Sequence, residues 1–326
     1  MALNLFSKKN DTAGPPVAGR RTRPFVPAEK VKLPNDPLAR ALQCRRFGRI
    51  LNGRAEWADH PDFKKTYDRA MDLLDAYFAL VPEGFVSIAM SIFDEPGAPE
   101  KDFDTEPFLL ARYAVTNADY QYFVDDGGYE NLELWPEDIW PRLIDFKDKT
   151  GEPGPRFWEQ SRHERDLADH PVVGICHYEA LAYARWAGYR LPTETEWQMA
   201  ATWRIRSSAH VNRRYPWGDA LDLNFCNIWA SGHGTTLPVN ACAGGAAPNG
   251  VLQLIGNAWE WTASDFEAVD RDRQPVVGDT LLKVIRGGAF DTYFPWQAVS
   301  NFRSGLGCVS RAHNVGFRCA LDLPPG

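Results

Sequence analysis

The sequence predicts an α+β fold with little regular secondary structure, and two observations favour it. The 326 residues include 12 Trp and 26 Gly. That content suits a loop-rich fold in which aromatic rings supply the core that long helices and strands would otherwise provide. From about residue 81 onward, short strand-like runs and short capped helices follow one another along the chain.

The bulk composition is globular, with 44% hydrophobic and 24% charged residues and a formal net charge of −7. No basic excess indicates a nucleic-acid partner, and no run of about 18 apolar residues predicts a membrane span. The N-terminus lacks the apolar segment of a secretory signal, so we expect a cytoplasmic protein. The six scattered cysteines are then expected to be reduced and mostly buried.

The chain divides into three predicted parts. Residues 1–36 carry few large apolar residues and are expected to form a flexible arm. Residues 37–80 are expected to form a helical extension, and residues 81–326 the main domain. The extension has apolar residues at spacings of three and four, which predicts one apolar helix face. These residues are Phe63, Tyr67, Met71, Leu74 and Phe78.

Short elements open the main domain. Residues 81–90 and 107–115 alternate in the manner of strands, and residues 93–106 are interpreted as a polar loop between them. A helix is expected to start at Thr116 or Asn117, either of which can cap it.

Two further helices are expected in the stretch 171–201. The first should end at Gly188, since glycine is the usual residue after a helix C-terminus. In the second, Thr193 and Glu196 match a capping box.

Several motifs then occur in order: VTNADYQYFV, RLPTETEWQMAA, YPWGD, GNAWEWT, VIRGGAF and VGFRCA. Together they resemble the formylglycine-generating enzyme (sulfatase-modifying factor) family over roughly residues 81–323. The stretch DGGYENLELWPEDIW is closer in texture to the ergothioneine-type sulfoxide synthase branch. The resemblance implies a modified C-type-lectin-like fold.

The motif GNAWEWT places a carboxylate between two tryptophans. By the resemblance, Asn257 and Glu260 would donate side-chain oxygens to a structural Ca²⁺, an ion that tolerates irregular geometry. The alternative is that Glu260 pairs with a buried Arg or with backbone amides. A second calcium site is implied at Asn227 and Ile228, although the stretch ASGHGTTLPVN lacks the acidic residue expected there.

The family's oxygen chemistry is harder to place. Sulfatase-activating members bind copper through a cysteine pair, since soft thiolates suit Cu(I); here Cys308 stands alone and Cys319 belongs to the closing strand. Sulfoxide synthases carry iron on three histidines, and the seven histidines of this chain show no HxxxH or HxH spacing. A copper-type formylglycine synthase is therefore not expected.

Other polar residues receive structural interpretations. His163 and His170 flank a stretch expected to be a surface loop, while His177 is expected to cap or pack at a helix start. Arg286 and Arg318 should anchor the fold, because a buried Arg needs partners for its five donors.

Residues 289–315 are the predicted ligand-binding surface. In the family this region lines the active or binding face, and aromatic, Arg and Asn side chains are typical of binding pockets. The alternative for Phe290 and Phe294 is that they fill the core. The candidate ligand-binding residues are Asp291, Tyr293, Trp296, Asn301, Arg303, Arg311 and His313.

Three functions follow as hypotheses. The first is a non-catalytic or accessory member that binds a protein or a small molecule through residues 289–315. The second is a non-heme iron or copper oxidase, either with ligands rearranged among His313, His177, Asp291 and Cys308 or completed by a partner subunit. The third is a variable ligand-display protein of a diversity-generating retroelement.

Overall fold

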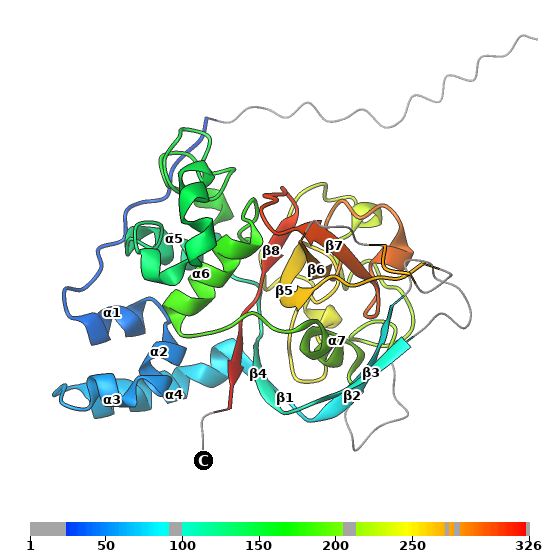
Figure 1. Ribbon diagram of the computed structural model, residues 1–326, viewed down its shortest axis with the longest axis horizontal. Coiled ribbons are helices and arrows are strands. Elements are labelled where there is room, and N and C mark those ends of the chain that lie inside the picture. Colours follow the sequence, from blue (N-terminus) through cyan, green and yellow to red (C-terminus); the bar gives the residue numbers. More distant parts are fainter. Residues whose placement is uncertain (1–23, 91–99, 205–212, 271–273, 277–280, 324–326) are drawn as a thin grey trace, which may run out of the picture.

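The computed structural model describes residues 24–90, 100–204, 213–270, 274–276 and 281–323. It confirms the α+β class, with most of the helices at one side of the molecule and α7 (Glu194–Thr202) packed against strands at the other (Figure 1). Most of the predicted arm lies outside the described residues, but Pro27 forms an isolated bridge with Glu164. Within the described residues, no helix combines the length and the apolar character needed to cross a bilayer. The predicted domain boundaries remain predictions.

Phe78, which we placed on the apolar helix face, is instead the first residue of a strand, but the rest of the predicted extension is largely helical. It comprises α1 (Pro37–Gln43), α2 (Phe47–Asn52), α3 (Arg54–Trp57) and α4 (Phe63–Tyr77). The buried stripe of α4 is Thr66, Ala70 and Leu74. Met71, which we placed on the apolar face, is 38% exposed, because the stripe advances in steps of four and Met71 lies one position beyond it.

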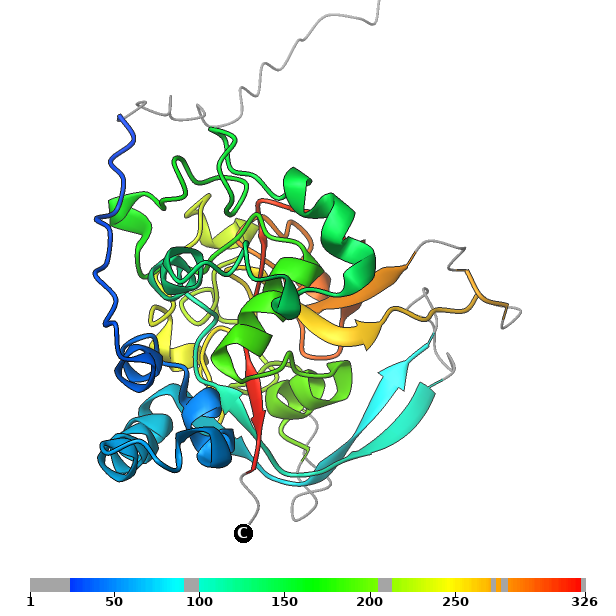
Figure 2. The ribbon, with the colours of Figure 1, turned by 60° about the vertical axis from the view of Figure 1, so that its left-hand side comes forward.

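Two of the sheets are formed by strands between residues 78 and 111 and by the end of the chain. One sheet has the antiparallel order β1–β4–β9, and β2 pairs with β3 in a two-stranded ribbon that curves away from the body (Figure 2). Their bounds are β1 Phe78–Val81, β2 Gly84–Ala89, β3 Glu100–Thr105, β4 Phe108–Ala111 and β9 Ala320–Asp322.

Strand β3 corrects the prediction of a polar loop over residues 93–106. Its polar side chains Asp102 and Asp104 are exposed, while Phe103 packs against a buried cluster. A ribbon that buries only one face accepts such polar residues on the other, so the strand gave little apolar signal.

The third sheet brings the family-like motifs together. Its order is β7–β6–β5–β8, with β5 and β8 parallel and the other pairs antiparallel. Glu260 on β5 lies opposite Arg286 on β6 and Gly316 on β8. The strands are β5 Trp259–Asp265, β6 Leu282–Arg286, β7 Arg303–Gly307 and β8 Val315–Phe317.

The remaining α-helices are α5 (Asn117–Asp125), α6 (His177–Ala187) and α7 (Glu194–Thr202). Their predicted caps are confirmed. The Thr116 hydroxyl accepts from the amide of Asp119 at 3.0 Å, and Gly188 closes α6 with φ of 75°.

Several 3₁₀ segments lie within the loops of the described chain. They cover Leu132–Leu134, Glu137–Asp145, Arg165–Leu167, Trp229–Ser231, Ala243–Gly245 and Pro295–Gln297.

The histidine interpretations need one correction. His163 is only 5% exposed and packs edge-on against Trp158, with ring centroids 5.4 Å apart. The indole of Trp158 shields His163 from water, although the residues next to His163 in the sequence are charged and indicated a surface loop. His170 is half-buried and contacts the Thr236 hydroxyl. His177 packs against Trp261 as expected.

All six cysteines are free, without a disulfide bond.

Candidate functional site

The carboxylate between the two tryptophans is paired with an arginine. Glu260 is 2% exposed and Arg318 is fully buried. Each oxygen of Glu260 accepts one Arg318 hydrogen bond at 2.7 Å, and Oε2 also accepts from the indole of Trp197 at 2.7 Å. Arg318 donates further to the carbonyls of Ala111 and Leu252. This bidentate, charge-assisted pair is the alternative to calcium that the sequence left open.

The neighbouring amides form their own cluster. The side-chain oxygen of Asn257 accepts from Asn227 at 3.0 Å and from the amide of Leu237 at 2.7 Å, and its nitrogen donates to Gln253 at 2.7 Å. The side-chain oxygen of Asn227, next to Ile228, is buried without a hydrogen-bond partner among the described residues.

These contacts give calcium little support at the predicted sites. The oxygens of Glu260 and Asn257 already accept hydrogen bonds from protein groups. Of the predicted side-chain ligands, this leaves the Asn227 oxygen, and Ca²⁺ prefers carboxylates among its ligands. Within the described residues, no group of three or more His, Cys, Asp and Glu side chains could hold a metal ion. The calcium site stays a prediction.

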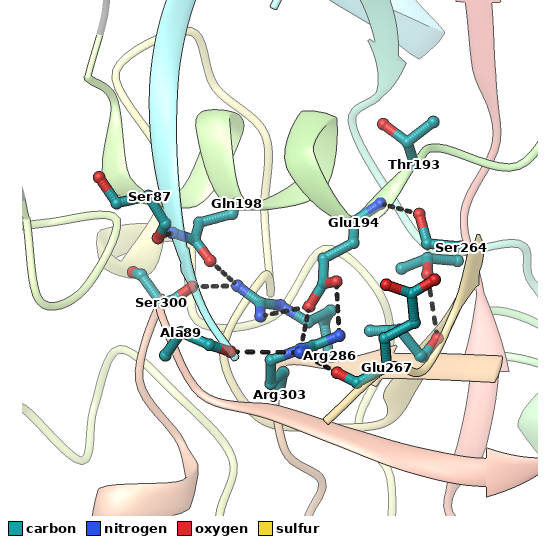
Figure 3. Close-up of polar contacts among 12 residues, drawn as sticks. Ser87, Ala89, Thr193, Glu194, Gln198, Ser264, Glu267, Arg286, Ser300 and Arg303 are labelled. Atoms are coloured by element: carbon teal, nitrogen blue, oxygen red, sulfur yellow. Dashed lines mark hydrogen bonds and ion pairs between the residues drawn. The ribbon is translucent and has the colours of Figure 1, made fainter. Parts of the chain in front are cut away.

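A second buried network lies beside β6 and β7 (Figure 3). Arg303 donates to both oxygens of Glu194, at 2.7 and 3.0 Å. Arg286 donates to Glu194 at 3.1 Å and also contacts Gln198 and the carbonyl of Ser300. Burial lowers the pKa of Arg286 to about 10, against the opposing effect of Glu194. Arg286 therefore anchors the fold, as predicted.

Arg303 and Arg311, both predicted ligand-binding residues, are mostly buried. Both side chains are 9% exposed and form ion pairs, Arg303 with Glu194 and Arg311 with Glu179. Arg311 also donates to the carbonyl of Lys147 at 2.8 Å. Each arginine joins segments far apart in the chain, so their observed contacts are structural.

The other predicted residues do reach the surface, where four aromatic side chains cluster. We call Trp229, Tyr293, Phe294 and Trp296 the aromatic face; their exposures are 57, 63, 49 and 50%. Consecutive ring centroids are 6.0, 5.1 and 5.7 Å apart. The backbone amide of Trp229 donates to the carbonyl of Thr292, which holds the two segments together.

Asp291, two residues before Tyr293 in the chain, forms a polar pair with His313 at the surface. His313 Nε2 and Asp291 Oδ2 are 2.8 Å apart, and the Asn314 side chain donates to both Asp291 oxygens. The rings of Phe290 and His313 are in contact, with centroids 6.0 Å apart. Asn301 is also exposed. The surface thus combines exposed aromatic rings with polar groups able to make hydrogen bonds.

The donors proposed for a transition metal do not converge. Asp291 and His313 contact each other, but the Cys308 sulfur faces the Tyr178 hydroxyl at 3.6 Å. Burial lowers the pKa of His177 to about 4, and its ring packs against Trp261. The residues present therefore do not fit a copper or iron site in the described part of the chain.

Comparison with known proteins gives relatives with different names. Hercynine oxygenase of Mycobacterium tuberculosis is 34% identical over 69% of this chain, which spans only 55% of that protein's length. The bovine protein named inactive C-alpha-formylglycine-generating enzyme 2 is 30% identical over 70% of this chain and 82% of its own length. The structure of PvdO from Pseudomonas aeruginosa matches 76% of this chain and 94% of its own, with 21% identity and a TM-score of 0.49.

Residues 69–323 match the family model described as sulfatase-modifying factor enzyme 1-like domain, which identifies the family. The match spans the buried Glu–Arg pairs described above and the aromatic face. This chain belongs to the formylglycine-generating enzyme, or sulfatase-modifying factor, family.

Proposed function

We propose that this chain is a binding member of its family, which captures a protein or small-molecule ligand on the aromatic face. The observation that carries the proposal is the cluster of four large aromatic side chains, each about half exposed or more and in ring contact with the next. Exposed apolar clusters of this kind mark interaction sites on soluble proteins.

The chemistry of the face suits recognition. Trp and Tyr are enriched among residues that dominate binding energy, because they bring a large contact area with few rotatable bonds. Asp291 and His313 add a polar edge that can fix the orientation of a ligand. The scaffold beneath is rigid, since Trp296 packs on Phe302, which in turn packs on Trp259 of β5.

Affinity capture with matched variants tests this function. The bait proteins are the wild type, the double variant Phe294→Ser/Trp296→Ser, and Ile144→Ser as a control. Ile144 is 72% exposed and lies outside the aromatic face. We expect a ligand that the wild type and the control retain and the double variant loses. Equal capture by all three proteins would mean that the aromatic face does not bind the ligand.

A second candidate function is a metal-dependent oxidase, and the name hercynine oxygenase of a relative favours it. The candidate donors do not converge within the described residues, but a partner subunit could complete a site. The test is elemental analysis of the purified protein together with oxygen uptake. One equivalent of iron or copper with oxygen consumption would favour this candidate over the binding function. The retroelement hypothesis stays a prediction.

A further inference from the structure

A cavity of about 350 Å³ lies between the N-terminal helices and the family domain. Its lining comes from the start of α2, the junction of α4 and β1, the loop from β4 into α5, and α6. Figure 1 shows α2, α4, α5 and α6 on the left of the molecule, with β1 and β4 nearer its centre. Arg45 and Phe47 precede residue 69, where the family match begins, so this chain's own extension closes the cavity.

Six aromatic residues contribute to its wall. Phe47, Tyr77, Phe78, Tyr113, Tyr183 and Tyr189 all line the cavity. Phe47 packs on Tyr77 and Phe78 packs on Tyr189, with centroids 5.4 and 5.0 Å apart. The faces of such rings carry partial negative charge and attract cations.

One hydroxyl in this wall makes no hydrogen bond to a described residue. Tyr183 is only 5% exposed, and no hydrogen bond joins its hydroxyl to any residue in the described ranges. Burial raises its pKa, and Asp119, Cys319, Tyr189 and Arg45, which also line the cavity, act on the same group. Tyr183 lines the cavity, and its oxygen is accessible, since it is not one of the fully buried atoms that lack a partner. A ligand atom in the cavity can hydrogen-bond this hydroxyl in place of water.

The other polar groups set the charge of the cavity. The Tyr189 hydroxyl is occupied, since it accepts from the amide of Phe47 and donates to the carbonyl of Arg45. Asp119 accepts from Arg45 at 2.6 Å and from the Thr116 hydroxyl at 2.7 Å. Asp169 lines the cavity with an exposed side chain.

One cationic and two anionic side chains thus line the cavity, which disfavours an anionic ligand. The volume is at the small end of the range for ligand pockets, so the ligand must be small.

We propose that this cavity binds a small primary ammonium compound whose apolar body lies against the aromatic wall. The ammonium donates to the Tyr183 hydroxyl oxygen and is attracted by the carboxylates of Asp119 and Asp169. This site shares no residue with the aromatic face, and the proposal does not rest on the proposed function.

Calorimetric titration of the full chain with three isosteric probes tests the site. The probes are benzylamine, which is cationic at pH 7, neutral benzyl alcohol, and anionic benzoate. We expect benzylamine to bind about fivefold more tightly than benzyl alcohol, as one weakly screened charge interaction allows, and benzoate to bind most weakly. Absence of benzylamine binding at millimolar concentration, or benzoate binding as tightly as benzylamine, overturns the proposal.

Variants then place the probe in the cavity. Tyr183→Phe removes only the unpaired hydroxyl, so it should fold normally and weaken benzylamine about fivefold, the worth of one hydrogen bond. Asp169→Asn should weaken it about threefold, whereas Asp166→Asn, an exposed carboxylate outside the lining, should have no effect. Ala118→Phe, which fills the cavity from α5, should abolish binding. Unchanged affinity in all of these variants means that the probe binds elsewhere, which overturns the proposal.

Discussion

The buried pair of Glu260 and Arg318 makes the sharpest stability prediction. Glu260→Gln keeps the shape of the side chain but removes its charge. Arg318 is fully buried and its ion pair is with Glu260, so in the variant it would keep a positive charge without compensation. Breaking a buried pair from one side costs about 3–5 kcal/mol, a large part of the roughly 5–15 kcal/mol that stabilises a typical domain.

The structure supports the upper part of that range. Glu260 accepts three hydrogen bonds, two of them from Arg318 and one from Trp197, and Gln can accept on only one oxygen. Its amide nitrogen would instead be placed against a donor. The substitution therefore removes a charge pair and creates a clash between donors at the same time.

Urea unfolding followed by tryptophan fluorescence measures the loss, with Glu56→Gln as the matched control. Glu56 pairs with Arg49 at 2.9 Å, but both side chains are nearly half exposed, so its loss should cost less than about 1 kcal/mol. If Glu260→Gln costs no more than Glu56→Gln, the buried pair does not stabilise the fold and the reasoning is refuted.

Three further predictions concern pH, calcium and the aromatic face. Burial lowers the pKa of His177 from its ordinary value of 6.5 to about 4 in the folded chain. The unfolding free energy should therefore be highest above pH 6.5 and fall by up to about 3 kcal/mol as the pH drops toward 4. Urea unfolding at pH 7 and 4.5 should show a smaller loss for His177→Phe than for the wild type, and an equal loss contradicts this. Calcium chelation should shift the melting temperature by less than about 1 °C, because the Glu260 oxygens are occupied, and a shift of several degrees would instead indicate an ion near Asn227. Phe294→Ser/Trp296→Ser should lower the unfolding free energy by about 1–3 kcal/mol, because two half-exposed rings lose their contacts with each other and with Phe302, and a loss above about 5 kcal/mol would show that these rings belong to the core.

Local features of the fold could be predicted from sequence because their causes are local. Thr116 caps α5 through an amide three residues away, and Gly188 ends α6 because it adopts a left-handed conformation. Strand β3 was missed, because one face of the ribbon is solvated and its sequence is polar.

The partners of buried charges could not be predicted, because they are distant in the chain. Arg303 meets Glu194 across 109 residues, and Arg311 meets Glu179 across 132. The positions of Arg303 and Arg311 in the sequence are as compatible with a ligand-binding surface as with buried ion pairs. Sequence alone therefore placed these two arginines with Tyr293 and Trp296, although only the aromatic residues are exposed.

Trp229 and the cavity were missed for the same reason. Trp229 joins Tyr293 only through tertiary structure, and the cavity is lined by several separate segments. The aromatic face itself left a partial signal in the sequence, because Tyr293, Phe294 and Trp296 follow one another closely where no apolar periodicity requires burial.

Site-specific photo-cross-linking tests the central claim, that the aromatic face is a binding surface, most directly. A benzophenone amino acid is placed at Trp296 in one protein and at the exposed control position Ile144 in another. The account predicts one discrete adduct from position 296 and none from position 144. The same adducts from both positions, or none from position 296 in the presence of the captured ligand, would contradict it.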